Sequence, residues 1–187
     1  MKVREIVFTM VIFGLAGCST MYYGAMEKVG VHKRDIMVNR VKAARESQSE
    51  AKQQFLTAMD QFKRVVKFQG GDLEAEYDRL NGTLQKTEAG AADVRNRIAA
   101  VEDVSEALFS EWRAEIQQYT SDALRKSSQQ KYDATKQKYG QLIAAMKSAE
   151  SKLEPALAPL RDQVLFMKHN LNRSEEHTSE LQSRQSI

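Results

Sequence analysis

The chain has 187 residues, a net charge of +3 and a single cysteine. This length suits one domain or two small ones, and one cysteine excludes both an internal disulfide framework and a zinc site built from several cysteines. Only 7% of the residues are aromatic, and two prolines and nine glycines are few for a β-sandwich or barrel. A charge of +3 is also too small to indicate a nucleic-acid-binding protein.

Residues 1–17 have the pattern of a secretory signal peptide. Two basic residues precede an apolar run of twelve residues, which is shorter than the roughly 20 that a membrane-spanning helix needs. The run ends in Leu15-Ala16-Gly17-Cys18, which resembles the bacterial lipobox. We therefore predict signal-peptidase recognition through Leu15, Ala16 and Gly17 and lipidation of the Cys18 thiol. The alternative is an ordinary cysteine that follows an apolar stretch.

The residue after the cysteine predicts where the anchor resides. Ser19 occupies the position at which Asp favours retention in the inner membrane, in the bacterial sorting rule that this sequence resembles. Each buried acyl CH₂ contributes about 0.8 kcal/mol, so several chains give durable anchoring. We expect a lipid-anchored protein on the periplasmic side of the outer membrane of a Gram-negative bacterium, with residues 18–30 as a lipidated linker.

The C-terminal residues 173–187 stand apart from the rest of the sequence. Residues 173–183 read RSEEHTSELQS, eleven consecutive residues that match the in-frame translation of a common sequencing adapter. We interpret 173–187 as a non-native tail and expect the natural C-terminus to be missing. The alternative is a native polar tail, which a genomic read through this region distinguishes.

Residues 31–172 have the features of a helical bundle domain. The clearest break is the glycine pair 70–71, which suits a helix C-terminus, and Asp72 can cap the next helix. A second break is expected beside Thr120 and Ser121, either of which suits an N-cap. The sequence therefore predicts three long helices.

Apolar residues recur in alternating steps of four and three along these segments, which is the 3.5-residue period of left-handed coiled coils. The expected core positions of the second segment are Leu73, Tyr77, Leu80, Leu84, Thr87, Ala91, Val94, Ile98, Val101, Ser105, Leu108, Trp112, Glu115 and Tyr119. Those of the third are Tyr132, Thr135, Tyr139, Leu142, Met146, Ala149, Leu153, Ala156 and Leu160, and then, after a slip of one residue, Val164, Met167 and Leu171. Those of the first are Met37, Val41, Ala44, Gln48, Ala51, Phe55, Ala58, Phe62 and Val65.

Short connections between long helices favour antiparallel neighbours. We expect an all-α fold, an elongated antiparallel three-helix coiled-coil bundle. Residues 31–68, 72–119 and 121–172 carry charges of +5, −6 and +4, so the acidic helix is expected beside two basic ones. The alternative is a helical hairpin that completes its core by forming a homo-oligomer.

Two prolines are expected to disturb the third helix. Pro155 and Pro159 lack a backbone N–H and clash with the preceding turn, so the helix is expected to be kinked or broken near 154–160. The alternative is a short loop followed by a fourth helix that starts at Pro159.

No catalytic, cofactor or metal constellation stands out in the sequence. It has no glycine-rich phosphate loop and no His-Glu-x-x-His motif, and its histidines, at 32, 169 and 177, are far apart. We therefore expect neither an enzyme nor a cofactor. Lys33 and Arg34, which follow the anchor closely, are the candidate contacts to an anionic membrane surface. The aromatic residues of the core stripe could instead line an apolar cavity.

Four stretches carry a resemblance to an uncharacterised family of bacterial lipoproteins with a domain of unknown function, DUF2959. They are MYYGAMEKVGVHKRDI at 21–36, GGDLEAEY at 70–77, VEDVSEALFSEW at 101–112 and DQVLFMKHNLN at 162–172. The resemblance implies an envelope location, an all-helical body and a family sequence that continues past Asn172. It implies no catalytic residues.

Together these features predict a structural or protein-interaction module, attached to the membrane by its lipid and bound to an envelope protein. The alternative is a protein that binds or carries a small apolar ligand or a lipid in the bundle core. The expected compartment disfavours nucleic acid as a partner.

Overall fold

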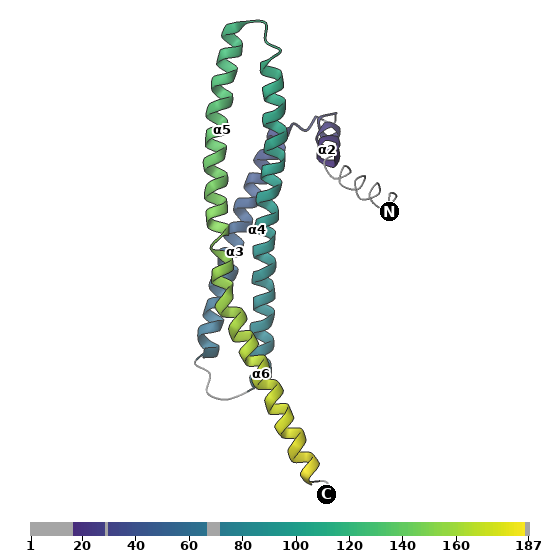
Figure 1. The fold of residues 1–187 in the computed structure, drawn as a ribbon, viewed down its shortest axis with the longest axis vertical. Helices are drawn as coiled ribbons and strands as arrows, with labels where there is room; N and C mark the ends of the chain where they lie inside the picture. The colour runs from purple at the N-terminus through teal and green to yellow at the C-terminus, as the bar shows by residue number, and fades with distance from the viewer. Residues whose placement is uncertain (1–16, 29, 67–71, 186–187) are drawn as a thin grey trace, which may run out of the picture. The chain divides into compact units, whose positions relative to one another are not determined.

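The computed structural model describes residues 17–28, 30–66 and 72–185. They form five helices, labelled in Figure 1, and no strand is present in these ranges. The helices are α2 (Gly17–Lys28), α3 (Lys33–Val66), α4 (Leu73–Ile116), α5 (Asp122–Glu150) and α6 (Leu153–Gln185). The predicted all-α fold is therefore confirmed for the described chain.

The breaks on either side of α4 lie where the sequence predicts them. The Asp72 carboxylate accepts a hydrogen bond of 3.0 Å from the Ala75 N–H, which is the geometry of an N-cap. At the start of α5, the Ser121 hydroxyl accepts a bond of 3.5 Å from the Leu124 N–H, so Ser121 rather than Thr120 is the cap. The glycine pair 70–71 lies outside the described residues.

The third predicted helix is divided, but before the expected stretch. α5 ends at Glu150 and α6 begins at Leu153, so the break is at 151–152 and the fourth helix does not start at Pro159. Pro155 falls in the first turn of α6, where helix N–H groups lack intrahelical partners anyway. Pro159 lies inside α6, which continues through it.

The chain forms two compact units, and its path crosses from one to the other within α3, α4 and α5. Unit 1 comprises residues 1–44 and 97–145, and unit 2 comprises 45–96 and 146–187.

Unit 2 contains one core cluster to which α3, α4 and α6 all contribute. Its buried members are Ala58, Val65, Leu80, Leu84, Ala91, Leu157, Leu160, Val164 and Met167. Most of them are positions that the heptad pattern predicts, including Val164 and Met167 after the slip. The Thr83 hydroxyl bonds to Gln61 and the Ser47 hydroxyl to Asp93, so partner numbers rise along α4 as they fall along α3. The two helices are antiparallel here.

In unit 1, two clusters of buried residues lie against α4. One joins α2, α3 and α4 through Tyr23, Ile36 and Val104. The other joins α4 and α5 through Phe109, Ile116 and Tyr132. The predicted stripe of α4 is buried from Leu80 to Ser105, but beyond this point Phe109 and Ile116 are buried in place of Glu115 and Tyr119, which are exposed.

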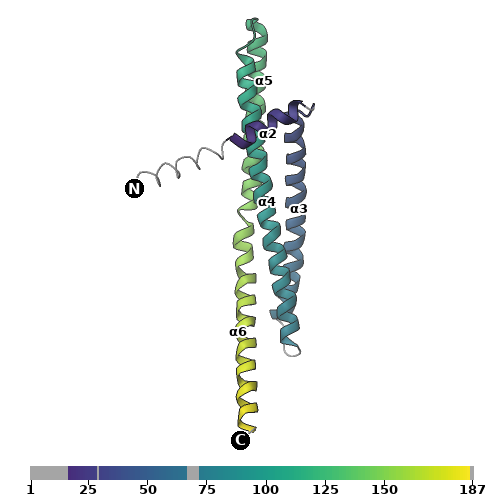
Figure 2. The same cartoon turned by 90° about the vertical axis from the view of Figure 1, so that its right-hand side faces the viewer.

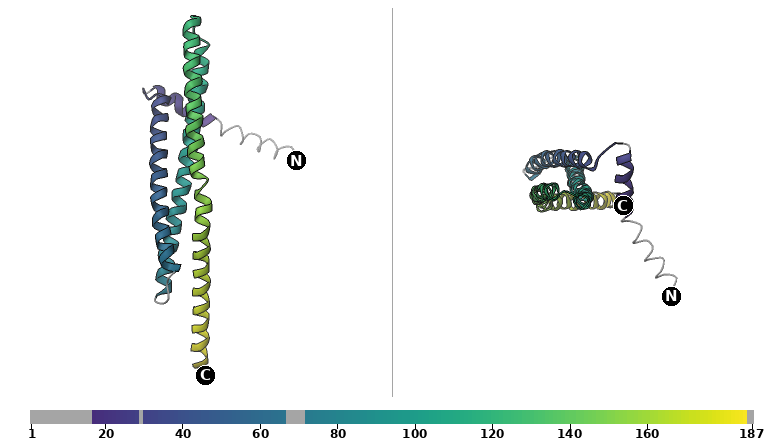
Figure 3. Two further views of the ribbon diagram at one scale, coloured as in Figure 1. Left: turned by 90° about the vertical axis from the view of Figure 1, so that its left-hand side faces the viewer. Right: turned by 90° about the horizontal axis from the view of Figure 1, so that it is seen from above.

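α2 and α3 meet in a tight turn at Gly30. The Gly30 N–H bonds to the Glu27 carbonyl at 3.0 Å and the Val31 N–H to the Met26 carbonyl at 2.9 Å, which is the Schellman pattern of a helix end. Gly30 has a φ of 84°, a left-handed conformation that suits glycine. The turn directs α2 across the C-terminal half of α4 (Figure 2), and the right-hand view of Figure 3 shows it from above.

Candidate functional site

The predicted lipidation motif lies at the edge of the described chain. Leu15 and Ala16 lie outside the described residues, Gly17 begins α2, and Cys18 is its second residue. The backbone from Gly17 to Lys28 is helical, so most of the expected linker 18–30 is an ordered element of unit 1. Cleavage after Gly17 and lipidation of Cys18 stay predictions.

α2 is attached to unit 1 by a buried tyrosine and two charged partners, which we call the Tyr23 cluster (Tyr23, Arg40 and Asp103). Tyr23 is 1% exposed, and its hydroxyl donates to the Asp103 carboxylate. The Arg40 guanidinium donates to the Tyr23 oxygen at 2.7 Å and to the Ala100 carbonyl at 2.7 Å. The same nitrogen forms an ion pair of 3.2 Å with Asp103. One arginine thus connects α2, α3 and α4.

The surroundings of Tyr23 change its acidity. Burial and the hydrogen bond to Asp103 raise the pKa of the phenol to about 12, although the Arg40 charge acts in the opposite direction. The hydroxyl therefore keeps its proton at all physiological pH values and acts here as a hydrogen-bond donor.

Lys33 makes a second connection between the same three helices. Its ammonium forms ion pairs with Glu27 of α2 and, at 3.2 Å, with Glu111 of α4. Burial lowers the pKa of Lys33, but hydrogen bonds to the two carboxylates outweigh it, and the net pKa is raised. Its side chain is 12% exposed, whereas that of Arg34 is 77% exposed. The predicted contact with a membrane surface therefore depends on Arg34.

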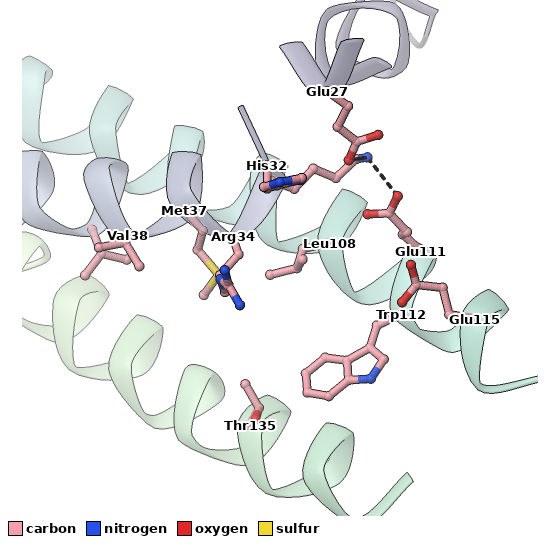
Figure 4. A pocket seen from close by; sticks show the side chains of 12 residues that line it. Glu27, His32, Arg34, Met37, Val38, Leu108, Glu111, Trp112, Glu115 and Thr135 are labelled. Carbon is pink, nitrogen blue, oxygen red and sulfur yellow. Dashed lines mark hydrogen bonds and ion pairs between the residues drawn. The ribbon is translucent and has the colours of Figure 1, made fainter. Parts of the chain in front are cut away.

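A cavity of about 910 Å³ opens in unit 1 between α3, α4 and α5 (Figure 4). We call it the unit 1 cavity. Its apolar wall consists of Met37, Val38, Val41, Leu108 and Trp112. Its charged and polar rim consists of Glu27, His32, Lys33, Arg34, Glu111, Glu115 and Thr135. The cavity lies where α3 and α5 each pack on α4 in separate clusters.

Trp112 is held in place by contacts with α5. Its indole N–H donates to the Ser128 hydroxyl at 3.1 Å, and its ring lies edge-to-face with Tyr132 at 5.7 Å between centroids. Tyr132 accepts a bond of 3.0 Å from Arg113. This bond, together with Lys136, lowers the pKa of Tyr132 even though burial opposes the change. The indole is thus a fixed wall of the cavity.

Unit 2 has a cavity of its own, of about 710 Å³, beside the break at 151–152. Its lining is largely apolar and includes Phe55, Val94 and Leu153. Arg95 bridges the break, because it pairs with Glu150 of α5 at 2.6 Å and with Glu154 of α6 at 3.1 Å. We call these three residues the Arg95 clamp.

Arg161 extends this network along α6. It pairs with Glu154 and, at 2.6 Å, with Glu88 of α4. Arg161 and then Arg95 lower the pKa of Glu154, and the carboxylates raise the pKa of both arginines. The Arg161–Glu88 pair has the sense that the charge pattern predicts, an acidic residue of α4 with a basic residue of the third segment. The Arg95 pairs have the opposite sense, because the cation lies on α4 and the carboxylates lie on α5 and α6.

The three histidines lie in different parts of the chain, as their sequence positions indicate. His32 lies at the rim of the unit 1 cavity, His169 is exposed on α6 in unit 2, and the His177 side chain lies outside the described residues. Across the described ranges, no three His, Cys, Asp or Glu residues are grouped so that they could hold a metal ion. No helix in the same ranges is long and apolar enough to cross a membrane.

Sequence reasoning missed both polar connections of unit 1. Tyr23 stands in a short segment with no heptad, and Arg40 and Asp103 lie 63 residues apart at helix positions that the pattern does not assign to the core. A large aromatic residue inside an otherwise linker-like segment was the only available signal. The charge of Lys33 indicates a surface contact, but the sequence does not show that Glu27 of α2 and Glu111 of α4 both lie beside it.

Comparison with known proteins identifies a family but no function. The family model described as a protein of unknown function, DUF2959, matches residues 22–183. This range includes residues 173–183, so the interpretation of the tail as non-native stays a prediction. No curated protein and no solved structure matches the chain. Because the family model covers most of its length, the chain belongs to the DUF2959 family of proteins of unknown function.

Proposed function

We propose that this protein is a lipid-anchored module of the bacterial envelope, held on the periplasmic side of the outer membrane, that acts by binding other envelope proteins. The observation that carries the proposal is the attachment of α2. Cys18 lies in the same helix as Tyr23, which is 1% exposed. An anchor on Cys18 would thus be joined to unit 1 by an ordered helix. Force applied to the lipid would be transmitted through α2 to α3 and α4.

The energetics of α2 agree with such a role. Detaching α2 exposes the buried Tyr23 ring and replaces the hydrogen bonds of its hydroxyl with bonds to water, and each such bond contributes about 0.5–1.5 kcal/mol net. Lys33 adds ion pairs with Glu27 and Glu111. A loose tether would need none of these contacts, whereas a tether that carries load or fixes orientation needs several.

We further propose that the helices pack as an antiparallel three-helix coiled coil. The core of unit 2 supports this packing, since α3, α4 and α6 all contribute buried residues to one cluster. A homo-oligomer that buries further apolar surface is the alternative, and sedimentation equilibrium of the purified chain distinguishes the two. We propose no enzymatic activity and no nucleic-acid partner.

Two adjacent apolar side chains on α6 are the candidate partner contact in unit 2. Leu165 and Phe166 are 53% and 60% exposed, although Val164 and Met167 on either side of them are buried. Aromatic side chains, Phe among them, are enriched at protein–protein interfaces relative to the rest of the surface. Phe166 is therefore the position from which a partner is best captured.

The anchor is tested with Cys18→Ala. We expect the variant to lose incorporation of a labelled fatty acid and to leave the membrane fraction or keep its signal segment uncleaved. Ser19→Ala is the matched control, because it keeps the thiol. Labelling of Cys18→Ala equal to that of the natural chain contradicts the proposal.

The partner contact is tested with a photoreactive amino acid in living cells. We expect the probe at Phe166 to give a discrete crosslink to an envelope protein, and the same crosslink to disappear in Cys18→Ala. The probe at Lys168, an exposed polar position on the same helix, is the control. Equal crosslinks from both positions, or none from either, count against an interaction surface on α6.

A further inference from the structure

The unit 1 cavity has an apolar wall that other elements of unit 1 leave open. Val38 is 61% exposed even though it lines this cavity, and Met37, Val41 and Leu108 beside it are only partly buried. Ligand pockets typically have volumes of about 300–1,000 Å³, an apolar lining and a few polar groups that orient the ligand. The cavity, at about 910 Å³, has the size and the lining of such a pocket.

Two residues of opposite charge on the rim, Arg34 and Glu115, do not form an ion pair with each other. Arg34 is 77% exposed, and among the described residues its one ion pair is with its neighbour Asp35, at 3.8 Å. The Glu115 side chain is exposed, and in the described part of the chain it makes no hydrogen bond or ion pair. Lys33 and Glu111, in contrast, already form an ion pair with each other. Figure 4 shows Arg34 beside the apolar wall and Glu115 beside Trp112.

We propose that the unit 1 cavity binds a zwitterionic phospholipid with an ethanolamine head group. One acyl chain lies along Val38, Val41 and Leu108. The Arg34 guanidinium contacts the phosphate, for which its planar donors are suited. The head-group ammonium contacts the Glu115 carboxylate and the face of the Trp112 ring, an arrangement that cations favour.

The charges on the rim favour this ligand over two others. An anionic phospholipid without an amine would place its phosphate near Arg34 but leave Glu115 uncompensated. A free fatty acid would have the same defect. The inference concerns unit 1 alone and does not depend on lipidation of Cys18 or on a partner protein.

Trp112 makes the proposal directly measurable, because it is the only tryptophan in the chain. The experiment uses the full chain with Cys18→Ala, so that no attached acyl chain competes. Vesicles of phosphatidylethanolamine with brominated acyl chains are added, since bromine quenches tryptophan on contact. We expect saturable quenching of Trp112 and, by native mass spectrometry, an adduct of one lipid per chain.

A matched pair of variants separates cavity binding from adsorption to the vesicle surface. Val38→Asp places a charge on the apolar wall, and Leu124→Asp places one on an equally exposed apolar residue outside the cavity. Both positions are more than half exposed, so neither change disrupts the core. We expect Val38→Asp to abolish quenching and Leu124→Asp to leave it unchanged. Equal quenching in both variants overturns the proposal.

The head group is tested with Arg34→Gln and Glu115→Gln. We expect each to weaken phosphatidylethanolamine binding about tenfold, the effect of losing one charge-assisted contact. Glu115→Gln is expected to remove the preference for phosphatidylethanolamine over brominated phosphatidylglycerol, and Lys126→Gln, an exposed residue away from the cavity, is the control. Equal binding of the two lipids by the unsubstituted cavity overturns the ethanolamine assignment. An absence of quenching by either lipid overturns lipid binding altogether.

Discussion

The two units use the same long helices but hold them together by different means. In unit 2, α3, α4 and α6 contribute mostly aliphatic residues to one shared core cluster. In unit 1, one cluster joins α4 to α2 and α3, and another joins α4 to α5. Polar contacts of Tyr23, Arg40 and Lys33 further connect α2, α3 and α4. The comparison indicates that α6 in unit 2 is held mainly by burial in a shared core, whereas α2 in unit 1 depends on specific polar contacts in addition to burial.

The largest effect is expected in the core of unit 2. Leu160 is fully buried in the shared cluster, and Leu160→Ala removes its contacts and leaves a void, at a cost of about 2–5 kcal/mol. Denaturant unfolding followed by circular dichroism measures the loss. The control, Leu165→Ala, alters a residue that is 53% exposed and is expected to change stability by less than about 0.5 kcal/mol. Equal losses would mean that α6 does not depend on this core.

A smaller and more local effect is expected from the Tyr23 cluster. Tyr23→Phe keeps the buried ring and removes only the hydroxyl that bonds to Asp103 and Arg40. The Asp103 side chain is 46% exposed and can turn to water, so we expect a cost of about 1 kcal/mol. Hydrogen exchange of the α2 amides should accelerate, while that of the unit 2 core stays unchanged. Acceleration in both units would contradict a local role.

High pH tests the same contact without a mutation. The folded pKa of Tyr23, about 12, lies above its ordinary value of 10.0, so folding favours the protonated phenol. Its stabilising contribution is complete below pH 10.0 and is lost as the pH rises through about 12. We expect an ultraviolet absorbance titration to show one tyrosine that ionises late, and Tyr23→Phe to remove that late phase. A late phase that persists in Tyr23→Phe belongs to another tyrosine.

The periodic burial of α4 and the helix caps could be predicted from the sequence, whereas the contacts that follow no period could not. Heptad spacing identified the buried stripe of α4 from Leu80 to Ser105, because burial along a helix follows its period. Asp72 and Ser121 were predictable as caps since capping depends on local chemistry. The sequence predicts the break near 154–160, whereas it lies at 151–152. The difference arises because Pro155 is accommodated in the first turn of α6, where a proline costs little.

The unit 1 cavity was not predictable in position. It depends on α3 and α5 packing in different clusters, and the switch of burial from the Leu108 and Trp112 stripe to Phe109 and Ile116 sets this arrangement. A heptad pattern shows which residues are apolar, but it does not show which of two adjacent apolar positions finds a partner. The Tyr23 cluster had the same difficulty, since its three residues come from three helices with no common spacing.

The smallest effect is expected at the Arg95 clamp, where all the partners are at least partly exposed and surface ion pairs contribute little. Arg161 and then Arg95 hold the folded pKa of Glu154 below its ordinary value of 4.5. The contribution of Glu154 is therefore complete above pH 4.5 and is lost as the pH falls through the lowered value.

Arg95→Gln tests this clamp, because it leaves Arg161 as the only cation beside Glu154. We expect the pKa of Glu154, measured by carboxyl NMR, to move part of the way back toward 4.5, and amides near the break at 151–152 to exchange faster. Arg79→Gln removes a pair with Glu76 that lies within α4 alone, so it serves as the control and should leave Glu154 unchanged. If Glu154 titrates identically in both variants, Arg95 does not join α5 to α6. The connection of the third segment across its break would then depend on other contacts, above all on the burial of Leu157 and Leu160 in the core cluster of unit 2.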